Sequence, residues 1–160
     1  AMCYYETIEG EMKDSAPIIK AREKFEYITK NFPNTDFALD SNFKLDLIED
    51  ILAAKEMYIG RHYLKKEKWI ASINRFKNVV EDYDQTIFVT EALHRLVEIN
   101  YNLGLIEESQ KYANILGYNY QSSEWYKKSY KIFNENYSVK INQKIKKDKK
   151  GVLKQFKKLF

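Results

Sequence analysis

The residues best suited to acid–base or metal chemistry stand singly along this 160-residue chain. His62 and His94 lie 32 residues apart, and neither belongs to the His-Glu-x-x-His arrangement that holds zinc on one helix face. Adjacent carboxylates point apart on a helix and cannot share one proton, as in the pairs Glu49-Asp50 and Glu107-Glu108. We therefore expect no catalytic site, no metal and no cofactor, and ordinary surface or packed positions for both histidines.

Cys3 is the one cysteine, which excludes an internal disulfide and a multi-cysteine metal site. A lipid-modified cysteine requires a processed signal peptide, and no charged and apolar signal segment precedes Cys3. We expect a buried helix residue at this position and a longer parent chain. The five glycines stand alone, so no phosphate-binding loop is expected either.

Arg75 is the sharpest candidate for recognition. A planar guanidinium suits a bidentate contact with a carboxylate of a partner, and arginine is enriched among interface anchors. Arg75 precedes Phe76, an expected core residue, so it should project near the edge of a helical repeat. His94 and Arg95 open a following helix and are expected to extend the same surface. The alternative is an ordinary exposed helix arginine.

Three similar turns organise the chain. Each follows an apolar helical run and ends in a residue that can cap the next helix; they are residues 31–35 (Asn-Phe-Pro-Asn-Thr), 82–86 (Asp-Tyr-Asp-Gln-Thr) and 119–123 (Asn-Tyr-Gln-Ser-Ser). Five glycines and two prolines are few for a β-architecture and suit long helices. The pattern predicts an all-α fold of tetratricopeptide-like helical hairpins stacked as a solenoid.

The middle repeat places small and aromatic residues where two antiparallel helices cross, with Gly60 on the first helix and Ser72 and Phe76 on the second. The next unit turns at residues 103–105, where Gly104 suits a left-handed backbone and where we expect one residue fewer than in the preceding turn. From Thr35 to about Lys66 apolar residues recur at helical spacing without proline. This predicts one helix of about 30 residues, roughly 45 Å long, shared between two repeats.

Charge separates the last residues from the rest. Residues 138–160 contain nine lysines and one acid, so this segment carries +8 and the preceding part −4. We expect a repeat domain at 1–137 and a basic amphipathic extension at 138–160. Apolar residues form a helical stripe among lysines there, and the candidate contact residues are Lys154, Phe156, Lys157 and Leu159. The extension could pack back on the repeats, enter the groove of a partner or lie on anionic lipid; nucleic acid fits less well, because the body is acidic and lacks a recognition motif.

Aromatic residues gather between positions 112 and 133. They are Tyr112, Tyr118, Tyr120, Trp125, Tyr126, Tyr130 and Phe133. A core that closes the end of the solenoid is the favoured interpretation, since terminal repeats need capping. The alternative is a groove for a partner lined by rigid aromatic side chains.

The first turn, the long helix ending in Tyr58-Ile59-Gly60-Arg61-His62-Tyr63 and the run from Trp69 to Phe76 together resemble the BamD (ComL/YfiO) family, over most of residues 1–120. BamD is the lipoprotein subunit of the β-barrel assembly machine of Gram-negative outer membranes. The resemblance is to the C-terminal repeats of that family. It implies that the repeats and the lipid anchor of the N-terminal half are not in this sequence.

The resemblance further implies a non-catalytic scaffold at the periplasmic face of the outer membrane. Such a protein docks on a POTRA domain of the barrel subunit BamA and meets accessory lipoproteins and unfolded outer-membrane clients. Asn74-Arg75 falls where the family has an arginine at the BamA contact. The basic extension after about Ser138 departs from shorter family members. Another bacterial tetratricopeptide adaptor with a different client is the alternative.

Overall fold

The structure, a computed structural model, describes residues 1–8 and 16–134. Every regular element in these ranges is an α-helix, which confirms the predicted all-α class. The helices are α1 (Met2–Glu6), α2 (Ala16–Asn31), α3 (Asp36–Lys65), α4 (Trp69–Asp82), α5 (Val89–Asn102), α6 (Ile106–Asn119) and α7 (Glu124–Phe133). The chain divides into two compact units, Ala1–Leu96 and Val97–Phe160, and the division falls inside α5. The predicted boundary at residues 137–138 lies outside the described residues.

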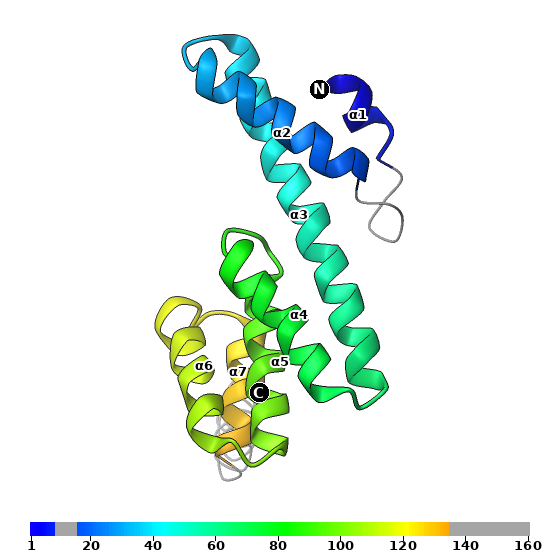
Figure 1. Cartoon of the computed structure of the whole chain (residues 1–160). Helices are drawn as coiled ribbons and strands as arrows, with labels where there is room; N and C mark the ends of the chain where they lie inside the picture. Colours follow the sequence, from blue (N-terminus) through cyan, green and yellow to red (C-terminus); the bar gives the residue numbers. More distant parts are fainter. Residues whose placement is uncertain (9–15, 135–160) are drawn as a thin grey trace, which may run out of the picture. The chain divides into compact units, whose positions relative to one another are not determined.

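The long helix α3 confirms the predicted shared helix, with 30 residues from Asp36 to Lys65. Its first half packs against α2 and its second half against α4 (Figure 1). Ile18, Ala21 and Phe25 of α2 meet Ile48 of α3 in a fully buried cluster. The apolar periodicity read from the sequence therefore marks the inner face of α3.

α1 packs on α2 within the first unit. The rings of Tyr5 and Phe25 form a T-shaped pair with centroids 5.9 Å apart. Cys3, on the same short helix, is exposed. The expectation of a buried Cys3 was wrong, because a helix of one and a half turns buries only the face that carries Tyr5.

Gly60 and Ser72 lie where α3 and α4 cross. The Ser72 hydroxyl donates a hydrogen bond to the Gly60 carbonyl at 2.9 Å, and both residues are buried. The ring of Phe76 fills the space beside Gly60 and is fully buried. The predicted crossing of small and aromatic residues is thus confirmed.

The turn after α3 recurs after α5, and the shift is 37 residues. The residues that precede α4 and α6 have nearly the same backbone, with φ/ψ of −85°/70° at Lys68 and −84°/67° at Leu105. The residues just before them are left-handed, with φ of 55° at Glu67 and 77° at Gly104. The left-handed Gly104 confirms its predicted role. The expectation that this turn lacks a residue was wrong, because the two turns match position for position.

The same shift relates the helices that follow. Ser109 of α6 donates to the Val97 carbonyl at 2.8 Å, as Ser72 donates to Gly60. The helices α4 and α6 then end in the same way, with φ/ψ of −133°/41° at Tyr83 and −135°/41° at Tyr120. A repeated hydrogen bond and repeated helix ends show that the two hairpins are copies of one structural unit.

Two of the three predicted helix caps are present. The Thr35 and Ser123 side chains accept hydrogen bonds from the backbone N–H three residues ahead, at 3.3 and 3.1 Å. Thr86 differs from the expectation, because α5 begins only at Val89, three residues later. Residues 87–88 form a further turn there, so the side chain of Thr86 does not cap the helix.

Candidate partner-binding surfaces

Arg75 lies on α4 and contacts Glu56 on α3. Its Nη1 atom donates to both carboxylate oxygens of Glu56, at 3.0 and 3.1 Å, and Asn78 donates to one of them at 3.1 Å. The Arg75 side chain is 38% exposed and that of Glu56 17%. Both bonds use the same nitrogen, Nη1. They hold the guanidinium in place, and its other N–H groups are not bonded to Glu56.

Arg95 belongs to a second charged cluster, centred on Glu91 of α5. Arg61 of α3 holds Glu91 with two hydrogen bonds, from Nε at 3.0 Å and from Nη2 at 2.6 Å. Arg95 Nε lies 3.5 Å from the same carboxylate, one helical turn further along α5. Partial burial alone would raise the pKa of Glu91, but the hydrogen bonds and charge of Arg61, with a contribution from Arg95, lower it below its usual value of 4.5.

The three residues predicted at one contact surface differ in exposure. Arg75 and Arg95 are partly exposed, with 38% and 26% of their side chains accessible. His94 is buried, with 6% exposed. The structure thus puts Arg75 and Arg95 in two separate ion-pair clusters, each joined to α3, and packs His94 inside. Their role in binding a partner stays a prediction.

The acidic partners of these arginines were not singled out from the sequence. Glu91 and Arg95 are spaced i, i+4 on one helix, a signal that was there to be found. Glu56 and Arg75 are 19 residues apart, so their contact depends on how α3 and α4 cross. The spacing of Glu56 and Arg75 along the chain therefore does not predict that they pair.

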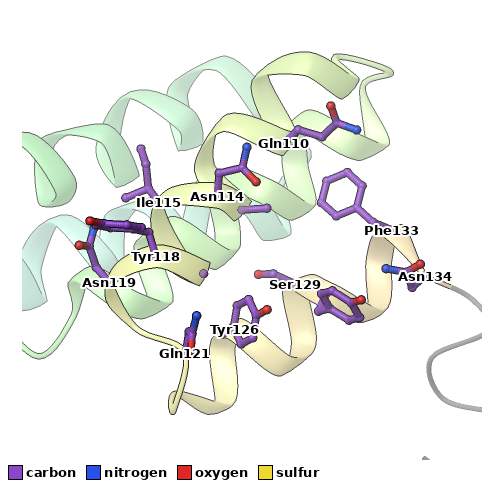
Figure 2. A pocket seen from close by; sticks show the side chains of 13 residues that line it. Gln110, Asn114, Ile115, Tyr118, Asn119, Gln121, Tyr126, Ser129, Phe133 and Asn134 are labelled. Carbon is purple, nitrogen blue, oxygen red and sulfur yellow. The ribbon is translucent and has the colours of Figure 1, made fainter. Parts of the chain in front are cut away.

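The aromatic residues of the second unit divide between core and surface. Tyr112 is buried, whereas Tyr118 is 89% exposed. Between α6 and α7 lies a pocket of about 920 Å³ whose lining includes Tyr118, Tyr126 and Phe133 (Figure 2). Figure 2 shows amide side chains on the same walls, among them Asn114 and Gln121. The core interpretation thus holds for Tyr112, and the groove for a partner stays a prediction.

The predicted tail contacts lie outside the described residues: Lys154, Phe156, Lys157 and Leu159. None of the helices in 1–8 and 16–134 combines the length and apolar content that a membrane span requires. In the same ranges no group of three or more His, Cys, Asp or Glu side chains is placed to hold a metal ion.

Comparison with known proteins yields one family. A family described as YfiO, outer membrane lipoprotein, matches residues 1–116. The outer membrane protein assembly factor BamD of Rickettsia prowazekii (strain Madrid E) is 46% identical over 132 residues, which cover 82% of this chain and 53% of the relative. BamD of Caulobacter vibrioides is 40% identical over 136 residues, covering 85% of this chain and 45% of the relative.

A more distant relative, BamD of Neisseria gonorrhoeae, is 32% identical over 82 residues, covering 51% of this chain and 30% of the relative. The chain spans about half the length of the first two relatives. The resemblance stated from the residues is confirmed by these matches. The chain belongs to the YfiO family of outer membrane lipoproteins.

Proposed function

We propose that this chain is a non-catalytic scaffold for outer membrane protein assembly, placed at the periplasmic face of the outer membrane. The names of relatives that match more than four-fifths of the chain support the process. Helical hairpins of this kind present fixed surfaces and so suit a protein that holds partners in one orientation. The parent protein reaches the membrane through a lipid anchor.

The partner surface that we propose centres on Arg75. Glu56 and Asn78 fix the Arg75 guanidinium at the crossing of α3 and α4, while more than a third of its side chain stays accessible. An arginine held in this way loses little conformational freedom when it binds a second acceptor. The pre-positioned Arg75 is the observation that supports this site best.

The partner is a POTRA domain of BamA, with other lipoproteins of the machine and unfolded outer-membrane proteins as further contacts. Arg95 extends the surface, because it shares the Glu91 carboxylate with Arg61 and is partly exposed. His94 contributes indirectly: it is buried and supports the first turns of α5, the helix that carries Arg95. Neither nucleic acid nor a cofactor takes part.

The test is a titration of this chain against the POTRA domains of BamA from the same organism. Arg75→Gln removes the charge and Arg75→Glu reverses it; both should weaken saturable binding, by about tenfold or more for the reversal. Arg22 offers a matched control, because its side chain is also 38% exposed and also pairs with a glutamate on the surface. Arg22→Gln and Arg22→Glu should leave the affinity unchanged.

Thermal unfolding of each variant separates binding from folding, since Arg75→Glu places two carboxylates together. If folded Arg75→Gln binds as tightly as the wild type, Arg75 is not at the contact. If the wild type itself shows no saturable binding, the proposal of a POTRA partner for this part of the protein fails.

A further inference from the structure

The first half of α3 carries an exposed apolar stripe. Leu39, Phe43 and Leu47 are spaced i, i+4 and i+8, so they lie one above the other on one helix face. They are 59%, 62% and 51% exposed. The opposite face of the same helix segment is the one that packs on α2 through Ile48. Both sides of this half of α3 are therefore apolar, but only the side that faces α2 is covered.

Comparison with α5 shows which face of the first half of α3 is uncovered. The turns before α3 and α5 match, because the Thr35 and Thr86 hydroxyls donate to the carbonyl three residues back at 2.8 Å in both. A shift of 51 residues aligns the inner face of this half of α3 with the inner face of α5. Ala38 then matches Val89, and Ile48 matches Ile99; all four side chains are buried.

The outer faces differ. Phe43, which is 62% exposed, corresponds to His94, which is 6% exposed, and the exposed Asp46 corresponds to the fully buried Val97. At Val97 the covering element is a helix, α6, whose Ser109 donates to the Val97 carbonyl. The counterpart of α6 is α4, which packs on the second half of α3, so no described element of the first unit covers the outer face of the first half.

The charge around the stripe indicates what would fit there. Residues 36–50 include five acids and one base. The base, Lys44, is bound to Asp40, and Glu49 lies 3.8 Å from Arg22. Three aspartates, at positions 36, 46 and 50, lie on the same side of the helix as the stripe, and Asp46 and Asp50 are one turn apart. Such a face repels lipid phosphates and nucleic acid and attracts cations.

We propose that the outer face of the first half of α3 binds a cationic amphipathic helix of a partner protein. Its apolar residues at i, i+4 and i+8 would cover Leu39, Phe43 and Leu47, and its lysines or arginines would meet the flanking aspartates. The straight stripe at i, i+4 and i+8 fits the apolar face of a helix, and the aspartates indicate the charge of that helix. This surface is distinct from the one centred on Arg75.

A labelled synthetic helix of about 18 residues, with leucines at i, i+4 and i+8 between lysines, is a suitable probe for fluorescence anisotropy with the full chain. Phe43→Ser with Leu47→Ser should weaken binding about tenfold or more. The matched control is Ile70→Ser with Ile87→Ser, two side chains that are even more exposed, at 76% and 78%. The control pair should leave the affinity unchanged.

Charge reversal provides a second, independent readout. Asp46→Lys with Asp50→Lys should abolish binding of the lysine peptide and create binding of a peptide with glutamates in place of the lysines. Glu23→Lys with Asp84→Lys, two exposed acids elsewhere in the same unit, is the control and should do neither. If the variant lost affinity for the lysine peptide but did not bind the glutamate peptide, the cause would be a general charge effect, and the proposal would be overturned.

Two further outcomes would contradict it. One is equal binding to the wild type and to the Phe43→Ser, Leu47→Ser variant. The other is binding that appears only when Phe156→Ser and Leu159→Ser are introduced, because the occupant would then be the chain's own basic segment and not a partner helix.

Discussion

Gly60 on α3 and Phe76 on α4 lie so close that a Cβ atom at position 60 would be 2.7 Å from Cε1 of the phenylalanine ring. The ring is fully buried, so it can move aside only by displacing its neighbours. The absence of a side chain at Gly60 therefore sets how closely the two helices approach. The hydrogen bond from Ser72 to the Gly60 carbonyl depends on the same approach.

Gly60→Ala should destabilise the first unit, although alanine is the better helix former. Overpacking costs about 1–3 kcal/mol and exceeds the gain of about 1 kcal/mol in helix propensity. Urea unfolding followed by circular dichroism measures the difference. Gly60→Ala combined with Phe76→Leu should cost less than the sum of the two single changes, because the smaller side chain makes room.

Gly117→Ala is the matched comparison for this prediction. A Cβ atom there would be 3.0 Å from the ring of Tyr126, which is only half-buried and can swing away. The change should be neutral or slightly stabilising. If both alanines had the same effect on the urea midpoint, close packing at Gly60 would not be its cause.

The left-handed residues Glu67 and Gly104 should respond in opposite ways to substitution. Left-handed backbone costs a residue with a side chain about 1–2 kcal/mol and costs glycine little. Gly104→Ala should therefore destabilise the protein by about 1 kcal/mol, with no clash involved, because nothing lies within 4 Å of the added Cβ atom. Glu67→Gly should stabilise it by up to about 1 kcal/mol.

The measurement is the midpoint of thermal unfolding for each variant. Lys66→Gly, one residue before Glu67 and with φ of −95°, serves as control and should not stabilise. Stabilisation by Lys66→Gly as well would show that the gain does not come from the left-handed conformation.

Ser72→Ala and Ser109→Ala should cost similar free energies of unfolding, about 1 kcal/mol each. Both serines are fully buried, and both donate one hydrogen bond to a helix carbonyl, to Gly60 and Val97. Loss of either hydroxyl leaves a buried carbonyl with one acceptor site unused. Chemical denaturation of the two variants gives the comparison, and a difference above about 1 kcal/mol would argue against equivalent hairpins. Ser122→Ala, at an exposed turn position, is the control.

Much of the fold could be predicted because it depends on local chemistry. The uninterrupted apolar periodicity from Thr35 predicts α3, and Gly104 predicts the left-handed turn before α6. Thr86 shows the limit: its hydroxyl makes the same turn bond as that of Thr35, yet α5 begins three residues later, which the sequence of the turn does not reveal. The candidate site was less accessible to prediction, because Glu56 meets Arg75 through the crossing of two helices. The open face at Phe43 was invisible for a similar reason: an apolar stripe in the sequence does not reveal which of its faces lacks a neighbour.

Glu91 should make the free energy of unfolding of the first unit depend on pH under acidic conditions. Arg61 and Arg95 lower the pKa of Glu91 in the folded protein below 4.5, its usual value when unfolded. Above that value the carboxylate is ionised in both states and its stabilising effect is complete. As the pH falls below 4.5 the unfolded chain takes up the proton first, so the effect is lost progressively as the pH passes through the lower folded pKa.

Glu91→Gln should therefore cost about 1–2 kcal/mol at pH 7, because two charge-assisted hydrogen bonds from Arg61 are weakened. The difference between wild type and variant should shrink steadily as the pH falls below 4.5 and through the lower pKa of the folded state. Urea unfolding at a series of pH values measures it. Glu108→Gln is the control, because the Glu108 side chain is 53% exposed and its carboxylate lies 3.9 Å from the Lys111 amine. This change should alter neither the free energy of unfolding nor its dependence on pH. A difference for Glu91→Gln that stayed constant down to pH 3 would mean that packing around the side chain, and not its charge, joins α5 to α3.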